Sequence, residues 1–137
     1  MKCIVFSEFS RMCKILNREL KGSLMIIGET PQEERQKIIK DFQENPERQI
    51  LIMSRAGEMA LNLHQSDLVF HYDCPMTYAS YDQRISRARR QGRKDPVVSV
   101  RMVTRGTLEE KIYKLIEKKK DISLATMPFT ELIKELL

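Results

Sequence analysis

Residues 2–27 read KCIVFSEFSRMCKILNRELKGSLMII, which is a short apolar run, an amphipathic segment and a second apolar run. The two runs, residues 2–7 and 23–27, are rich in β-forming side chains and have the length of buried strands. Between them, apolar residues recur at helical spacing: Phe9, Met12, Cys13, Leu16 and Leu20. Gly22 is well placed to end that helix. The stretch therefore predicts a strand, a helix and a second strand in succession.

The same alternation continues along the rest of the chain. Further apolar runs predict strands at residues 49–53, 67–71 and 97–103. Thr30 as the N-cap, with Pro31 at the first helical position, predicts a helix that runs to about Glu44. Other helices are expected over residues 78–90, from a capping box at Thr107–Glu110 to about Lys120, and after Thr130.

Strands that alternate with helices are typical of a parallel β-sheet with helices on both faces. We expect an α/β fold of one domain over residues 1–137, with about five or more strands and a closing helical segment at 121–137. Ligands on such sheets gather at the carboxyl ends of the strands. Function is therefore expected in the loops that follow Ser7, Gly28, Met53, His71 and Val103.

The positive charge is concentrated in one segment. The chain has 24 Lys and Arg residues and 19 Asp and Glu residues, which gives a net charge of +5. Residues 84–94 hold six basic residues and no acidic one, so the rest of the chain has 18 basic and 19 acidic residues. The excess is therefore local, which is typical of a binding site rather than of a generally basic protein.

Composition excludes several classes of protein. No apolar run approaches the roughly 18 residues that a membrane span needs, and the first six residues are too short for a signal peptide. Three widely spaced cysteines indicate a reduced, intracellular setting. Two isolated histidines argue against a metal site, and His71, at the end of a buried strand, is expected to be structural.

The segment from Tyr78 to Gly92 carries most of the information about function. At about 100° per residue, one helix face has an apolar stripe of Tyr78, Tyr81, Ile85 and Ala88. The opposite face presents Gln83, Arg87 and Arg90. Arginine binds phosphate oxygens through a planar fork and keeps its charge at any working pH. We therefore expect this face to contact a polyphosphate, while a solvated basic face and a patch for a nucleic-acid backbone remain alternatives.

The run Gln83-x-x-x-Arg87-x-x-Arg90-x-Gly92 resembles motif six of the superfamily-two helicases, and its surroundings resemble the SWI/SNF-like branch. The resemblance extends along nearly the whole chain. Val5–Phe9 is similar to motif four, and Ala56-Gly57 with Leu61–Leu63 to parts of motif five. Further matching positions are Gly28, Thr30, Arg35 and Phe42 after the second strand, Asp73-x-Pro75 and Tyr81 before motif six, and Gly106–Lys111 before the closing helix.

This resemblance implies the second RecA-like lobe of a two-lobed motor, which binds ATP with magnesium in the cleft between the lobes. The first lobe would supply the phosphate loop and the magnesium carboxylates. In this chain, Arg87 and Arg90 would be arginine fingers beside Gln83. The resemblance also assigns nucleotide contacts to Gly57, Glu58, Asn62 and Asp73. It assigns contacts with the nucleic-acid backbone to Ser7, Thr30, Arg35, Ser54 and Arg55.

The chain also departs from the family pattern. Glu58 and Ala60 stand where motif five often has glycines, Met76 replaces a tryptophan, and Arg93 replaces a glutamine. No G-x-x-x-x-G-K-[ST] phosphate loop occurs, so we expect no ATP hydrolysis by this lobe alone. Arg84, Arg89, Arg93 and Lys94 are expected to be available for backbone contact or solvent.

The expected partners are an N-terminal RecA-like lobe and DNA, double-stranded rather than single-stranded, with no membrane. The expected location is inside the cell, in the cytoplasm or nucleoid, or in the nucleus of a eukaryote. The lack of long accessory segments favours a viral or prokaryotic source. Two other readings remain: a non-catalytic nucleic-acid-binding module with the same fold, and an α/β interaction domain for an acidic partner.

Overall fold

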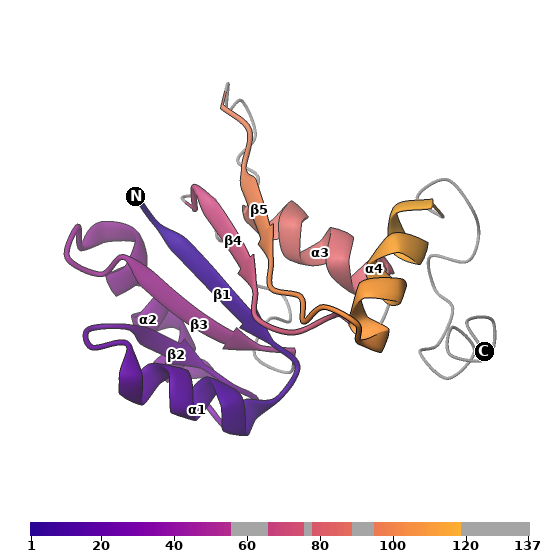
Figure 1. Ribbon diagram of the computed structural model, residues 1–137. Coiled ribbons are helices and arrows are strands. Elements are labelled where there is room, and N and C mark those ends of the chain that lie inside the picture. Colours follow the sequence, from indigo (N-terminus) through magenta and orange to yellow (C-terminus); the bar gives the residue numbers. More distant parts are fainter. Residues whose placement is uncertain (56–65, 76–77, 89–94, 119–137) are drawn as a thin grey trace.

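The computed structural model describes residues 1–55, 66–75, 78–88 and 95–118, which form one parallel sheet with helices on both of its faces (Figure 1). The strand order is β2-β3-β1-β4-β5. The strands are β1 Cys3–Ser7, β2 Leu24–Ile26, β3 Ile50–Ser54, β4 Leu68–His71 and β5 Val98–Arg101. The helices are α1 Ser10–Glu19, α2 Gln32–Glu44, α3 Tyr78–Ala88 and α4 Leu108–Lys118.

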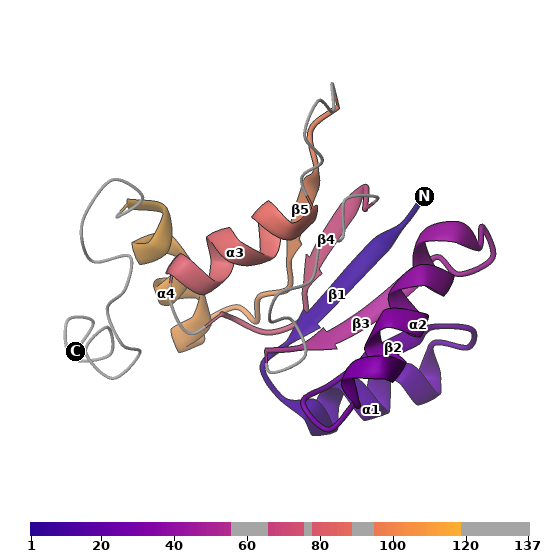
Figure 2. The same cartoon turned by 180° about the vertical axis from the view of Figure 1, so that it is seen from behind.

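The core divides into two layers because successive side chains of a strand point to opposite faces of the sheet. On one face, Ile4 and Phe6 of β1 pack in a cluster with Phe42 of α2 and Ala88 of α3. On the other face, Val5 packs in a cluster with Cys13 of α1. Figure 2 shows α2 and α3 on the side of the sheet away from α1. The predicted α/β fold with a parallel sheet is therefore confirmed.

The predicted strands are all present, and their bounds differ by a few residues. The largest difference is at β5, which was expected to reach Val103 and ends at Arg101. β5 pairs with β4, whose last residue is His71, and the bond from Met102 N to His71 O (3.0 Å) is the final link between them. Met102 and Val103 lie beyond their partner strand and are exposed.

Two predicted helix caps differ from the structure. The N-cap of α2 is Pro31 rather than Thr30. The Thr30 hydroxyl instead accepts a hydrogen bond from Ile27 N (3.0 Å), so it closes the turn after β2. Before α4, the hydrogen bonds differ from those of the predicted capping box at Thr107–Glu110. The Glu110 carboxylate accepts from Gly106 N (3.1 Å), and the Thr107 hydroxyl donates to Thr104 O (2.6 Å). Gly22, predicted to end α1, has a φ of 82° in the turn that follows the helix.

Lys2 secures the beginning of β1. Its ammonium donates to the carbonyl oxygens of Asn45 (2.7 Å), Arg48 (3.0 Å) and Phe42, and it lies 5.1 Å from the centre of the Phe42 ring. These carbonyls belong to the last turn of α2 and the segment after it, where a cation is favoured by the helix dipole. Lys2 thereby ties the beginning of the central strand β1 to the end of α2.

Helix α4 packs beside α3 rather than on the centre of the sheet (Figure 1). Its residues Ile112 and Tyr113 are buried against Tyr81 of α3 and Cys74, which follows β4. No helix in the described ranges is long and apolar enough to cross a membrane.

The strand order creates a switch point between β1 and β4. The chain leaves β1 toward β2 on one side of the sheet and leaves β4 toward β5 on the other side. In open parallel sheets this divergence makes the crevice where ligands bind. The residues that follow β1 and β4 therefore line this crevice and determine which ligands it can bind. Residues 56–63 of the expected motif five (53–63), the end of motif six (89–93) and the closing segment (121–137) lie outside the described residues.

Candidate functional site

Asp73 joins the loops that follow β1 and β4. One of its carboxylate oxygens accepts a hydrogen bond from the Ser7 hydroxyl, and the other accepts from Glu8 N (2.8 Å). Phe9 N donates to the Ser7 hydroxyl at 3.2 Å. The switch-point crevice is thus bridged by protein hydrogen bonds. Asp73, predicted to contact a nucleotide, uses its carboxylate to hold the loop after β1.

Arg84 lies inside the protein, whereas we expected it at the surface from the sequence. Its side chain is fully buried, and its guanidinium Nη2 lies 2.5 Å from the Glu8 carboxylate, which is itself only 5% exposed. Its Nη1 lies 3.4 Å from His71 Nδ1, and the guanidinium lies 5.2 Å from the centre of the Phe6 ring. The expectation that Arg84 is available for backbone contact is therefore wrong.

Helix periodicity explains the position of Arg84. It follows Tyr81 by three residues and precedes Ala88 by four, so it lies on the same side of α3 as these two. Ala88 is buried and Tyr81 is half-buried against the sheet side of the helix. Glu8 compensates the charge, so one of the six positive charges of residues 84–94 is neutralised in the core.

His71 is held in a neutral, structural role, as its place at the end of a buried strand predicted. It is fully buried, and its Nε2 lies 3.1 Å from the Ser99 hydroxyl on the neighbouring strand β5. Burial, with the nearby charges of Arg84 and Arg101, lowers the pKa of His71 to about 3. The imidazole therefore stays uncharged near neutral pH.

Two of the three predicted catalytic residues, Gln83 and Arg87, lie on α3. Gln83 is exposed, on a helix whose Arg84 and Ala88 are buried. Arg87 belongs to the last turn of α3, while Arg90 lies outside the described residues. The structure thus describes the anchoring of the helix and the exposure of Gln83, and the finger role of Arg87 and Arg90 stays a prediction. Gly57, Glu58 and Asn62 also lie outside the described residues.

The five predicted nucleic-acid contacts share the carboxyl edge of β1, β2 and β3. Ser7 and Ser54 are register partners at the ends of β1 and β3, and both are buried. Arg35 of α2 closes the loop after β2: its guanidinium donates to Thr30 O (2.8 Å), Gly28 O (3.0 Å) and Ile27 O (3.2 Å). Arg55, directly after β3, is exposed. Among these five, Arg55 has the side chain that is most open to a ligand.

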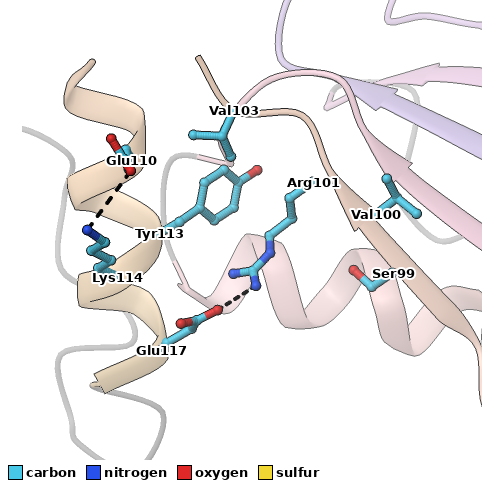
Figure 3. A pocket seen from close by; sticks show the side chains of 8 residues that line it. All are labelled: Ser99, Val100, Arg101, Val103, Glu110, Tyr113, Lys114 and Glu117. Atoms are coloured by element: carbon cyan, nitrogen blue, oxygen red, sulfur yellow. Dashed lines mark hydrogen bonds and ion pairs between the residues drawn. The ribbon is translucent and has the colours of Figure 1, made fainter. Parts of the chain in front are cut away.

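A second charged region lies between β5 and α4. Figure 3 shows Arg101 reaching from β5 toward Glu117 on α4, with which it forms an ion pair, beside the Tyr113 ring. The Arg101 guanidinium lies 5.0 Å from the centre of that ring, and Lys114 and Glu110 face each other at 4.0 Å. The Arg101–Glu117 pair attaches α4 to the edge strand β5, and the Lys114–Glu110 pair lies within α4.

The donor set of the carboxyl edge fits one side of a bound nucleotide better than a magnesium site. The Asp73 and Glu8 carboxylates are both engaged by donors of the protein. Within the described ranges, no group of three or more His, Cys, Asp or Glu side chains could hold a metal ion. The exposed Gln83 and Arg55 can instead donate to phosphate oxygens.

Sequence reasoning missed the Glu8–Arg84 pair, although a signal for Arg84 exists. Its helical phase places it within the apolar stripe, which points to burial despite its charge. Glu8 carries no comparable signal, because its partner is 76 residues away in the sequence. Lys2 was also missed, and its carbonyl partners lie at least 40 residues away.

Known proteins resemble this chain in sequence along most of its length. Residues 1–92 match the helicase conserved C-terminal domain. The chain is 32% identical over 92% of its length to the chromatin-remodeling ATPase INO80 of Sclerotinia sclerotiorum. It is 37% identical over 82% of its length to the SNF2 domain-containing protein ENL1 of Oryza sativa. It spans only 8% and 12% of these two proteins.

Solved structures show the same fold. The C-terminal part of the Fun30 ATPase domain aligns with a TM-score of 0.76 at 30% identity, covering 84% of this chain and 39% of that one. The Sulfolobus solfataricus SWI2/SNF2 ATPase core in complex with dsDNA aligns with a TM-score of 0.72 at 31% identity, covering 92% and 27%. The curated relatives named above are eukaryotic and do not support the expected viral or prokaryotic source. The chain belongs to the helicase conserved C-terminal domain family, as a C-terminal RecA-like lobe of the SWI/SNF-like branch.

Proposed function

We propose that this chain is the second motor lobe of an ATP-dependent DNA translocase or helicase, which works with an N-terminal RecA-like lobe. The observation that carries the proposal is the anchoring of α3, the helix that begins motif six. Buried Arg84 attaches α3 to the carboxyl end of β1, and Gln83 is exposed on the same helix. This lobe supplies donors at the edge where parallel sheets bind ligands.

The proposed chemistry is phosphoryl transfer to water, in which charge develops on the transferred group. Arg87 and Arg90 would stabilise that charge as arginine fingers, with Gln83 beside them. ATP and magnesium would be held mainly by the N-terminal lobe, with Gly57, Glu58 and Asn62 contacting the nucleotide from this side. Asp73 would act indirectly, because its carboxylate holds the loop after β1. Alone, this lobe would not hydrolyse ATP.

The nucleic-acid track would run along the carboxyl edge of β1, β2 and β3. Arg55 is exposed there and suits a phosphate. Ser7, Ser54, Thr30 and Arg35 shape the same edge, where Arg35 closes the loop that Thr30 belongs to. Such contacts position a strand without reading its sequence. Double-stranded DNA is the proposed substrate because a solved relative is a core in complex with dsDNA. The proposed location is inside the cell, where DNA and ATP are present.

The test uses the assembly that contains both lobes. Arg87→Ala and Arg90→Ala should each lower DNA-stimulated ATP turnover by roughly 10³-fold or more, as losing an arginine finger does, while DNA affinity changes little. Arg18→Ala is the matched control, because Arg18 is exposed on α1, and it should leave turnover intact. Near-normal turnover in both finger variants would refute the assignment.

The second candidate is a nucleic-acid-binding module without motor function, motivated by Glu58 and Ala60 in place of the motif-five glycines. The same assembly distinguishes the two functions. A module would bind DNA with a steep salt dependence and show no ATP turnover that DNA stimulates. DNA affinity would then fall in Arg87→Ala and Arg90→Ala in step with the lost charge, which is the opposite of the motor result.

A further inference from the structure

The Glu8–Arg84 ion pair connects two regions that the proposed function uses separately. Glu8 follows β1, whose carboxyl end is a proposed nucleic-acid contact, and Arg84 precedes Arg87 by one turn of α3. The two side chains are 5% and 0% exposed, and their joined atoms lie 2.5 Å apart. Both charged groups are therefore shielded from water and compensated mainly by each other.

Glu8 is held at both its backbone and its side chain. Its N–H donates to Asp73 after β4, and its carboxylate accepts from Arg84 on α3. The next residue, Phe9, is 60% exposed, so the far side of this loop is open to a ligand or partner. A displacement of the loop after β1 would consequently reach α3 directly through the Glu8 carboxylate.

Arg84 in turn fixes the rotation of α3. Its guanidinium contacts Glu8 after β1, the Phe6 ring of β1 and the His71 ring of β4. Turning α3 about its axis would withdraw the guanidinium from all three. Arginine suits this task because its planar fork prescribes direction as well as charge. A buried ion pair is weak evidence for stability alone, since apolar residues of similar volume often replace it without loss.

We propose that Glu8 and Arg84 are a positioning pair: they orient α3 so that the residues of motif six meet the nucleotide, and they couple that orientation to the loop after β1. The inference rests on the proposed motor function. Neither residue is assigned a contact with ATP, so neither is a catalytic residue. The pair acts through α3, and its loss should lower the rate of the stimulated reaction more than the binding of ATP or DNA.

The experiment replaces both partners in the two-lobe assembly. Glu8→Met with Arg84→Met removes the charges and keeps side-chain volume, so the lobe should remain folded. The DNA-stimulated kcat should fall about 10- to 100-fold, as misplaced catalytic groups cause, with the KM for ATP and the Kd for double-stranded DNA within about twofold of wild type. The matched control is Arg18→Met with Glu19→Met, an exposed ion pair at 2.8 Å, which should change none of these values.

Several outcomes would overturn the proposal. A folded double variant with wild-type kcat and wild-type stimulation by DNA would show that the pair is only structural. If the double variant does not fold, Arg84→Lys decides: it keeps the charge and loses the planar fork, and an unchanged kcat in the folded variant would equally overturn the proposal. If Arg87→Ala lowers turnover and the positioning variants do not, the positioning role fails alone. If DNA does not stimulate turnover in the wild type, the proposed function fails and the positioning role with it.

Discussion

Removing one partner of the Glu8–Arg84 pair should destabilise the domain strongly, whereas removing both should not. The magnitude follows from burial: with exposures of 5% and 0%, the charge left behind cannot be solvated. A single removal from a buried pair costs about 3–5 kcal/mol, compared with about 0–1 kcal/mol for an exposed pair. Domains unfold with a free energy of about 5–15 kcal/mol. Either single variant, Glu8→Met or Arg84→Met, would thus lose a large part of the stability.

Urea unfolding followed by circular dichroism measures this effect. At a slope of about 2 kcal/mol/M, each single variant should lower the urea midpoint by roughly 1.5–2.5 M, and the double variant should stay within about 0.5 M of wild type. The control cycle uses Lys14→Met and Glu29→Met, whose ion pair at 3.3 Å is 52% and 71% exposed. Its single variants should each lose less than about 1 kcal/mol. If Glu8→Met lost no more than Glu29→Met, the argument from burial would be refuted.

Two further stability predictions concern other buried contacts. The pKa of His71 is about 3 in the folded protein and near 6.5 when unfolded, so the unfolded state binds the extra proton between these values; the free energy of unfolding should fall by about 1.4 kcal/mol per pH unit as the pH drops through this window. His71→Phe should remove that part of the slope between pH 6 and pH 4.5 in urea titrations, and an unchanged slope would contradict the assignment. Lys2→Met should cost about 1.5–3 kcal/mol, because it removes a charged donor to three carbonyl oxygens. Lys14→Met, the same change at an exposed ion pair, should cost less than about 1 kcal/mol, and equal losses at the two positions would count against the role of Lys2.

The elements of this fold could be predicted because their signals are local. The apolar run at residues 2–7 and the helical spacing of Phe9, Cys13 and Leu16 depend only on near neighbours in the chain, and they correspond to β1 and α1. The caps were less predictable. Thr30 has the chemistry of an N-cap, but its hydroxyl has a competing partner at Ile27 N in the turn after β2, and the structure uses that partner.

For the candidate site, residue type indicated which side chains could meet phosphate but not which of them are exposed. Ser7 and Arg35 occupy the predicted edge, yet both are engaged by the protein, by Asp73 and by the carbonyls after β2 respectively. The predicted exposure of Arg84 was wrong: a charged residue usually lies at the surface, but the helical phase of Arg84 places it on the buried face of α3. A buried guanidinium is stable only beside a compensating carboxylate, and the sequence does not reveal which carboxylate that is.

Local sequence patterns specify the alternation of strands and helices, the family to which the chain belongs, and the order of chemically suited residues along it. These properties follow from side-chain periodicity and residue type, which are read from neighbours a few positions apart. Tertiary structure alone decided the strand order β2-β3-β1-β4-β5, the bridge from Asp73 to the loop after β1, and the burial of Arg84 against Glu8. Each of these depends on groups more than 60 residues apart or on the path of the crossovers, because burial and charge compensation are properties of the packed chain.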